Sequence, residues 1–311
     1  MSKTESSSYE VMHHLFSRQL IFVSGKGGVG KTTLAVFLAQ MAARQGKNVL
    51  LCHINRLVEE PWETEYLSKY DKLSRISITP AAAMKEYVLI KLKSEKLYNM
   101  LFEGSGGLSV LRKAAPALNE LVLLGKVYWE CKQKSLWVAQ KWDHVIVDMP
   151  ATGHALTMLN IPSVVREIFG RGIVANETAK MDELFRDHAR ACLVLATLPE
   201  YMVIQETLEF AQVVRNQLHL ALGPLFINKM PDTPLNPTAR KLYEEHKPQL
   251  EAGVQHTVDF FQERHKASAE HWDLLKRNSN LPVMTLPFVY GGTSHPEFFH
   301  LIERQLVEYW M

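Results

Sequence analysis

The sequence predicts an α/β protein with a doubly wound, mostly parallel sheet, helices on both faces and several helical insertions. Short apolar runs without polar–apolar alternation recur along the 311-residue chain and alternate with helix-competent stretches. Parallel strands that are buried on both faces have this pattern. A glycine-rich turn follows the first apolar run and precedes a helical stretch. This order predicts a ligand-binding loop at the carboxyl end of a strand.

Six apolar runs are the strand candidates, at residues 20–23, 48–52, 144–147, 192–196, 224–227 and 283–286. Helical insertions are expected near three segments, 80–142, 156–190 and 236–277. Their apolar residues are best explained as core-facing, although residues 80–142 could instead form a groove for a partner helix. Residues 1–18 are predicted to be a flexible lead-in that ends in a short helix. No repeat or low-complexity linker divides the remainder, which favours a single domain over residues 19–311.

Composition excludes several functional classes. The net charge of +2 is too small to indicate a nucleic acid or an anionic membrane as partner. The sequence lacks a secretory signal and any apolar run of the roughly 18 residues that a membrane-spanning helix needs. Its three cysteines, Cys52, Cys131 and Cys192, share no metal-type spacing. They are expected to be buried free thiols in a reducing cytoplasm.

Residues 24–33 carry the strongest motif, Ser-Gly-Lys-Gly-Gly-Val-Gly-Lys-Thr-Thr. Its glycines allow backbone N–H groups to surround phosphate oxygens at the positive end of the following helix. Lys31 then reaches the outer phosphates, and the Thr32 hydroxyl ligates Mg²⁺. The predicted nucleotide-binding residues are Gly25, Lys26, Gly27, Gly28, Val29, Gly30, Lys31, Thr32 and Thr33. The sequence therefore predicts a site for a nucleoside triphosphate, ATP, with Mg²⁺.

A second motif ends the apolar run at residues 144–147. Asp148 follows it directly, and an acid at this position typically holds a water molecule on the bound magnesium. Thr32 directly and Asp148 through water are therefore the expected metal-binding residues. The chain continues with Thr152-Gly153-His154, where His154 either begins a helix or has a switch role.

These motifs together resemble a known family. The loop with its additional lysine, Lys26, resembles the deviant phosphate loop of a group of ATPases. The group includes the nitrogenase iron protein, partition and septum-positioning proteins and the arsenite-pump ATPase. The run from Asp148 to His154 is similar to the D-T-A-P-T-G-H segment of one branch of these ATPases. That branch holds the arsenite-pump ATPase and the ATPase that targets tail-anchored membrane proteins. Weaker similarities are Leu198-Pro199-Glu200, Glu206-Thr207 and Asn228. The chain is identified as a divergent, bacterial-type member of this branch.

The resemblance implies an ATP-hydrolysing switch that couples nucleotide state to the binding of a protein partner. Lys26 would cross a dimer interface to the partner's nucleotide, in a homodimer or in a heterodimer with a paralogous ATPase. Asn228 would read the adenine base. Lys26, Lys31, Asn55 and Asp148 would be the catalytic residues. Neither nucleic acid nor direct membrane insertion is expected, and the sequence leaves the protein client open.

One departure from the family concerns hydrolysis. The family reads V-L-L-x-S-T-D-P-A-H after its second strand, and the aspartate orients the attacking water. Here Asn55 stands in its place, and an amide holds a water but cannot accept its proton. Glu59 or Glu60 could substitute if the loop folds back. The alternative function is a nucleotide-gated binding or scaffold protein with little or no hydrolysis.

Two further departures concern clients. The targeting ATPases of eukaryotes carry a zinc-binding Cys-x-x-Cys late in the chain, whereas no cysteine follows Cys192 here. Clustered thiols for arsenite are likewise absent from the sequence. The segment 156–190 is short, and its only methionines are Met158 and Met181. It therefore does not show the methionine-lined groove that shelters varied apolar helices.

Overall fold

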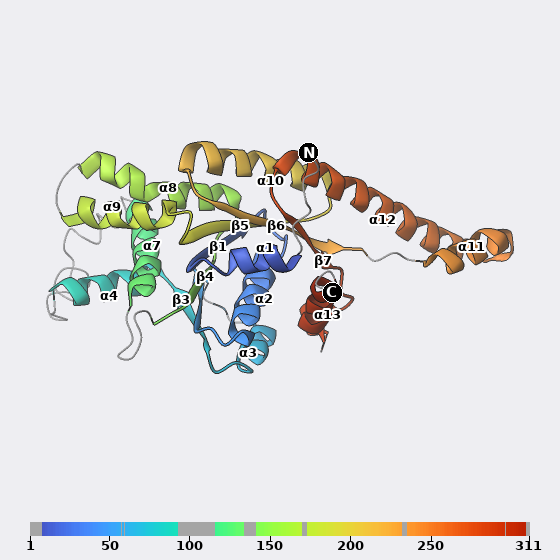
Figure 1. Cartoon of the computed structure of the whole chain (residues 1–311), viewed down its shortest axis with the longest axis horizontal. Coiled ribbons are helices and arrows are strands. Elements are labelled where there is room, and N and C mark those ends of the chain that lie inside the picture. The colour runs from blue at the N-terminus through green and yellow to red at the C-terminus, as the bar shows by residue number, and fades with distance from the viewer. Residues whose placement is uncertain are drawn as a thin grey trace.

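The computed structural model describes residues 8–56, 58, 60–92, 116–133, 141–169, 173–231, 235–295 and 297–308. Within these ranges seven strands form one sheet in the order β3-β2-β4-β1-β5-β6-β7 (Figure 1). The strands are β1 Leu20–Gly25, β2 Val49–Ile54, β3 Leu73–Ile78, β4 His144–Asp148, β5 Ala191–Thr197, β6 Leu222–Met230 and β7 Val283–Pro287. Every neighbouring pair is parallel. The predicted doubly wound α/β class is confirmed.

The strand prediction omits β3. The six apolar runs correspond to the other six strands, most of which extend one to three residues beyond the predicted bounds. Strand β3 lies at the edge of the sheet, and its sequence, LSRISI, mixes three polar with three apolar residues. An edge strand is only half buried, so it does not need the continuous apolar run that identifies the central strands.

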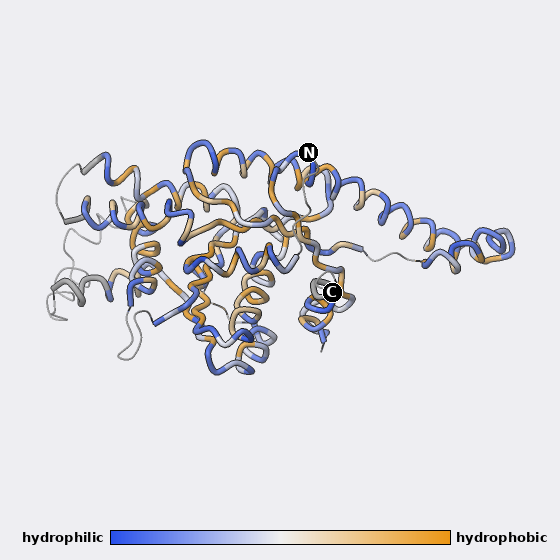
Figure 2. Tube along the Cα trace, viewed as in Figure 1, coloured by the Kyte–Doolittle hydropathy of each residue, from blue (hydrophilic) through white to orange (hydrophobic). Residues whose placement is uncertain are grey.

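Helices cover both faces of the sheet. One face packs against α7 Pro116–Lys132, α8 Thr152–Phe169, α9 Ile173–Arg186, α10 Tyr201–Val213 and α12 Ala252–Ser279. The other packs against α1 Ser8–Leu15, α2 Lys31–Arg44, α3 Pro61–Leu67 and α13 Phe298–Glu308. Within β1, Leu20 and Phe22 face the first layer, whereas Ile21 and Val23 face the second. Figure 2 shows that hydrophobic residues concentrate in the strands and in α2.

The remaining elements are α4 Pro80–Leu92, α11 Pro237–His246, a π-helical turn at Val214–Leu218, and 3-10 turns at Lys247–Gln249 and Gly292–Ser294. Helices α4 and α7 belong to the predicted insertion at 80–142, of which residues 93–115 and 134–140 lie outside the described residues. Leu124 and Val127 of α7 are fully buried, in agreement with the core-facing interpretation. Helix α11 and the first part of α12 extend away from the sheet (Figure 1).

Part of the predicted N-terminal lead-in belongs to the core. Val11, Met12 and Leu15 of α1 are buried against the sheet, so residues 8–15 form a packed helix. The division of the chain into a lead-in and one domain stays a prediction. Met158 and Met181 are both buried in the helix layer over the sheet and line no exposed groove.

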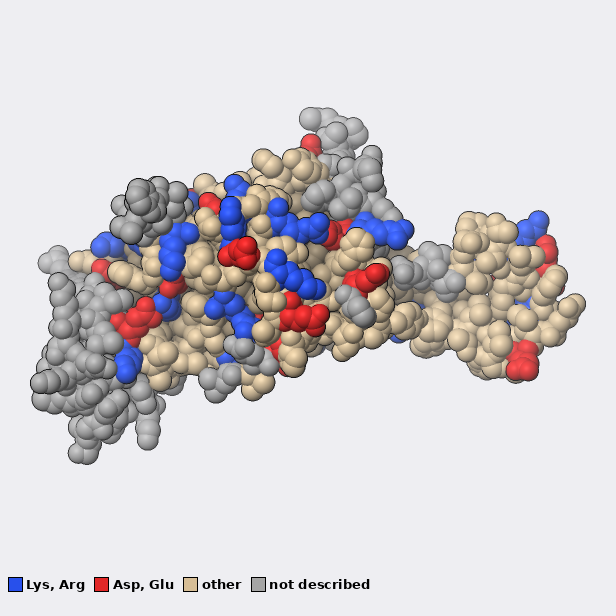
Figure 3. Space-filling view, turned by 90° about the horizontal axis from the view of Figure 1, so that it is seen from below, with Lys and Arg blue, Asp and Glu red and all other residues tan. Residues whose placement is uncertain are grey.

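The surface and the thiols agree with the composition. On the face seen in Figure 3, basic and acidic side chains are intermingled over the described residues. Within the described ranges, no helix is both long enough and apolar enough to cross a membrane. The three cysteines are free and buried. Burial raises the pKa of Cys131 and of Cys192 to about 12, which makes both thiols unreactive.

Candidate nucleotide-binding site

The phosphate loop lies where the winding of the sheet changes direction. Strand β1 is between β4 and β5, and the loop joins the end of β1 to Lys31, the first residue of α2. Ligands of open α/β sheets bind at such a position. Gly28 has a φ of 81°, and a Cβ added there would meet no atom within 4 Å. The loop therefore leaves room for a ligand directly against its backbone.

Gly30 is required for a different reason. Its φ is 92°, and an added Cβ would lie 2.2 Å from Nδ2 of Asn228. That amide, at the end of β6, donates to the carbonyl of Val29 at 2.9 Å. Asn228 is buried and braces the phosphate loop. Its expected recognition of adenine stays a prediction.

Lys31, Thr32 and Asp148 come together at the base of the loop. Nζ of Lys31 donates to the carbonyl of Lys26 at 3.1 Å. Burial lowers the pKa of Lys31 and the nearby Asp148 carboxylate opposes that effect. The Thr32 hydroxyl donates to Oδ2 of Asp148 at 2.7 Å. The structure therefore joins the two motifs, although 116 residues separate them in the chain. Thr33 follows in the first turn of α2.

The donor set fits magnesium bound together with phosphates. The hydroxyl of Thr32 and the carboxylate of Asp148 are hard oxygen donors, the kind that Mg²⁺ prefers. In the described part of the chain, no group of three or more His, Cys, Asp or Glu side chains could hold a metal. A magnesium ion would therefore need phosphate oxygens and water to complete its coordination, as it does in nucleotide sites.

Lys26 is held within its own chain. Its Nζ lies 2.8 Å from Oε2 of Glu206 on α10, and the two side chains are 43% and 39% exposed. Oε1 of Glu206 accepts a hydrogen bond from Thr152 at 3.1 Å. The hydrogen bond from Lys26 lowers the pKa of Glu206, and the bond from Thr152 adds to this effect. Glu206 therefore links the phosphate loop to the segment after β4.

Asn55 lies at the carboxyl end of β2 with a φ of 53°. Its backbone N–H donates to the carbonyl of Ile78 at 2.8 Å, and its side chain is exposed. Among the described residues, the hydrogen bonds that join Thr32 and Asp148 do not involve it. Glu60 is exposed and its carbonyl accepts from the first turn of α3, while Glu59 lies outside the described residues.

His53 and Glu63 are two residues that the motifs do not identify. Nδ1 of His53 lies 3.0 Å from Oδ2 of Asp148, and its Nε2 contacts Oε1 of Glu63. Glu63 also pairs with Arg56 at 2.7 Å and with Arg75 at 3.4 Å. The sequence signal for His53 is a histidine that directly follows an apolar run. Glu63 is only ten positions further along the chain, but the sequence does not indicate that its side chain is buried.

These contacts shift two pKa values. Burial alone would lower the pKa of His53, but the hydrogen bonds with Asp148 and Glu63 outweigh it, and the pKa is raised. Burial alone would raise the pKa of Glu63, but His53, Arg56 and Arg75 hold it below its ordinary value. Both shifts favour an ionised Glu63 beside a protonated imidazole.

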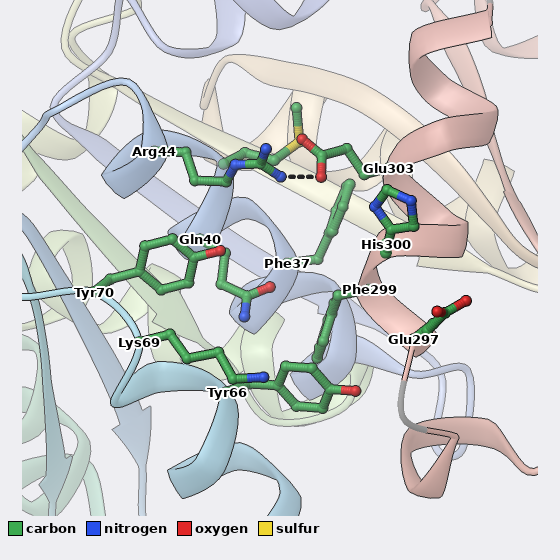
Figure 4. A pocket seen from close by; sticks show the side chains of 11 residues that line it. Phe37, Gln40, Arg44, Tyr66, Lys69, Tyr70, Glu297, Phe299, His300 and Glu303 are labelled. Atoms are coloured by element: carbon green, nitrogen blue, oxygen red, sulfur yellow. Dashed lines mark hydrogen bonds and ion pairs between the residues drawn. The ribbon is translucent and has the colours of Figure 1, made fainter.

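A cavity of about 230 Å³ lies away from the loop, on the second half of α2. Figure 4 shows its aromatic walls, Tyr66, Tyr70 and Phe299, which come from α3, the turn after it and α13. An ion pair between Arg44 and Glu303 borders it. Lys31 at the start of α2 is not among its lining residues, so the cavity is separate from the nucleotide site.

The parallel sheet, the glycine loop at its switch point and the Thr32–Asp148 pair define a nucleotide-binding protein of the phosphate-loop class. Residues 18–179 match the family described as anion-transporting ATPase, and the chain belongs to this family. This finding confirms the resemblance that the motifs indicated.

Individual relatives agree with the family. ATPase BagA of Mycobacterium tuberculosis is 26% identical over 228 residues, which are 68% of this chain and 65% of that protein. ATPase get3 of Schizosaccharomyces japonicus is 30% identical over 163 residues, covering 50% of this chain and 47% of the relative. ATPase GET3 of Kluyveromyces lactis is 31% identical over 162 residues, or 48% and 46% of the two chains. The chain thus spans less than two thirds of these relatives.

Proposed function

We propose that this protein is a magnesium-dependent, ATP-hydrolysing molecular switch whose nucleotide state controls the binding of a protein partner. The observation that carries the proposal is the Thr32–Asp148 hydrogen bond of 2.7 Å beside the glycine loop. It brings together the two groups that a magnesium nucleotide requires. Membership in a family of ATPases supports the same chemistry.

The residues have distinct roles in this proposal. Backbone N–H groups of the loop and Nζ of Lys31 bind the phosphate oxygens. Thr32 and a water on Asp148 would hold Mg²⁺, which when bound neutralises the charge on the outer phosphates. Asn55, at the end of β2, would hold the attacking water by hydrogen bonds. Since phosphoryl transfer depends mainly on positioning and charge neutralisation, hydrolysis does not require a carboxylate at that position.

The proposed working unit is a dimer. Lys26 lies in the loop with a half-exposed side chain, and its present partner, Glu206, is also half exposed. An exposed ion pair contributes little free energy, so Lys26 can exchange Glu206 for the phosphates of a facing subunit. Either a second copy of this chain or a paralogous ATPase could supply that subunit.

The test compares ATP turnover of the wild-type protein with that of Lys31→Ala. Loss of the lysine contact is expected to reduce turnover about 100-fold, as for other removed charge-stabilising donors. Lys241→Ala on α11, where the lysine is 80% exposed, is the matched control and should turn over ATP like the wild type. The proposal fails if Lys31→Ala releases phosphate at the wild-type rate while it still binds nucleotide.

A second candidate is a nucleotide-gated scaffold without sustained hydrolysis, and Asn55 is the residue that favours it. Light scattering of the protein with ATP, measured beside phosphate release, separates the two functions. Dimerisation without release supports the scaffold. Asn55→Asp should increase turnover by about tenfold or more if this residue faces the attacking water. An aspartate tolerates the left-handed backbone at this position, so an unchanged rate would remove Asn55 from the catalytic site.

A further inference from the structure

A group of ionisable side chains is buried directly behind the Thr32–Asp148 pair. The side chain of His53 is 4% exposed, that of Asp148 is 8% exposed, and Glu63 is fully buried. Burying such groups is unfavourable unless each is paired. Hydrophobic packing does not explain why His53, Glu63 and Asp148 are buried together, so the reason must lie in the contacts among them.

The cluster is a chain of hydrogen bonds that ends on Asp148. His53 and Asp148 are register partners on the neighbouring strands β2 and β4. Oδ2 of Asp148 contacts two donors, the Thr32 hydroxyl at 2.7 Å and Nδ1 of His53 at 3.0 Å. A carboxylate can accept about four hydrogen bonds. Asp148 can therefore keep both donors and still accept from a metal-bound water.

The two donors to Asp148 differ in what else they do. Thr32 lies at the start of α2 beside the phosphate loop, where its oxygen is also needed for the cation. His53 lies on β2, and its second nitrogen is already engaged by Glu63. His53 is therefore the donor whose position does not depend on whether a nucleotide is bound.

Glu63 fixes the plane of the His53 ring, and two arginines hold the Glu63 carboxylate in place. Arg56 and Arg75 both pair with its carboxylate. The charged groups that face His53 are thus the carboxylates of Asp148 and Glu63, with the two arginines behind Glu63. Two carboxylates on the two ring nitrogens require both nitrogens to donate, so the orientation of the ring is set from both sides.

We infer that His53 is a positioning residue of the nucleotide site. Supported by Glu63, it holds the Asp148 carboxylate in the orientation in which that group accepts from the water of a bound magnesium ion. This inference rests on the proposed function. It adds a residue that acts through Asp148 and does not itself touch nucleotide or metal. Partners of this kind commonly change metal affinity by about 10–100-fold when they are removed.

Two substitutions separate the contacts of His53. In His53→Asn, the amide nitrogen is as many bonds from Cβ as Nδ1 of histidine, so it can donate to Asp148 but not reach Glu63. In His53→Gln, the amide nitrogen corresponds to Nε2, so it can donate to Glu63 but not to Asp148. The measurement is ADP affinity by calorimetry with and without MgCl₂, beside thermal unfolding of the nucleotide-free proteins.

His53→Asn is expected to keep most of the wild-type enhancement of ADP affinity by magnesium, because its amide still donates to Asp148 and only the support from Glu63 is lost. His53→Gln is expected to lose about tenfold or more of that enhancement, while its affinity for ADP without magnesium is unchanged. A purely structural role for His53 predicts the reverse order, with His53→Asn the more damaged variant because Glu63 loses a partner. The thermal unfolding temperatures report on that structural contribution separately.

The inference is overturned if His53→Gln keeps the full enhancement or if a folded His53→Asn loses it. If His53→Gln does not fold, His53→Asn alone decides, because retained enhancement supports the inference and lost enhancement overturns it. A wild-type protein that binds ADP without any magnesium enhancement overturns the proposed magnesium site and this inference with it. Failure of the inference alone gives a different result: magnesium enhances ADP binding by the wild type, and it enhances binding by His53→Gln equally.

Discussion

Ionisable side chains flank the phosphate loop on two sides, and the two sides differ in burial. On the side of β2 and β4, His53, Glu63 and Asp148 are almost inaccessible to solvent. On the side of α10, Lys26 and Glu206 form an ion pair in which both side chains are about two-fifths exposed. The first group lies beneath the loop, and the second lies at its surface.

This difference in burial separates two tasks. A buried charge that loses its partner is strongly destabilising, so the ion pairs of the buried Glu63 are costly to break. An exposed pair contributes roughly 0–1 kcal/mol and can change partners at little cost. The structure therefore places the proposed magnesium-binding carboxylate on the fixed side and the lysine with the proposed intersubunit role on the exchangeable side.

The largest expected effect is on the fixed side. Glu63→Gln should lower the free energy of unfolding by on the order of 3 kcal/mol, because Arg56, Arg75 and His53 lose a buried carboxylate. Urea denaturation without nucleotide measures the change. Glu65→Gln, an exposed position on the same helix α3, is the matched control and should change stability by less than about 0.5 kcal/mol. Equal effects of the two variants would show that the buried pairs of Glu63 add no more stability than an exposed carboxylate on the same helix.

The stability that Glu63 contributes should also depend on pH. Its folded-state pKa lies below the ordinary value of 4.5, so the unfolded chain binds a proton more readily than the folded one. The contribution is then complete above about pH 5 and is lost as the pH falls through 4.5 toward the folded-state value. The difference in melting temperature between the wild type and Glu63→Gln should shrink over that range. A difference that is constant between pH 6 and pH 4 would contradict this assignment.

The smallest effect is expected on the exchangeable side. Glu206→Gln should change the free energy of unfolding by less than about 1 kcal/mol, because the Lys26 pair is exposed and screened by salt. By releasing Lys26, it should lower the protein concentration needed for ATP-dependent association about threefold. Light scattering over a concentration series measures this. Glu209→Gln, exposed on the same helix α10, should behave like the wild type.

A Glu206→Gln variant that unfolds as easily as Glu63→Gln would show that both sides are structural. One that associates less readily with ATP than the wild type would show that Glu206 supports, and does not restrain, the proposed dimer. Raising the salt concentration should reduce the difference between Glu206→Gln and the wild type, and should leave the effect of Glu63→Gln almost unchanged.

The sequence by itself determined the fold class, six of the seven described strands and the family. The reason is that these features depend on local patterns. A central parallel strand needs a continuous apolar run, and a phosphate loop needs consecutive glycines followed by lysine and threonine. The apolar run at residues 144–147 meets the first requirement and residues 24–33 meet the second, whereas Asp148 is recognised as a nucleotide motif only together with that loop.

Only the tertiary structure decided which side chains surround those motifs. Edge strand β3 escaped detection because half-burial permits polar residues. His53 meets Asp148 because β2 and β4 are neighbours in the sheet, and Lys26 meets Glu206 across 180 positions of the chain because α10 begins at the same edge of the sheet as the loop. Such contacts depend on strand order and burial, which no local pattern encodes.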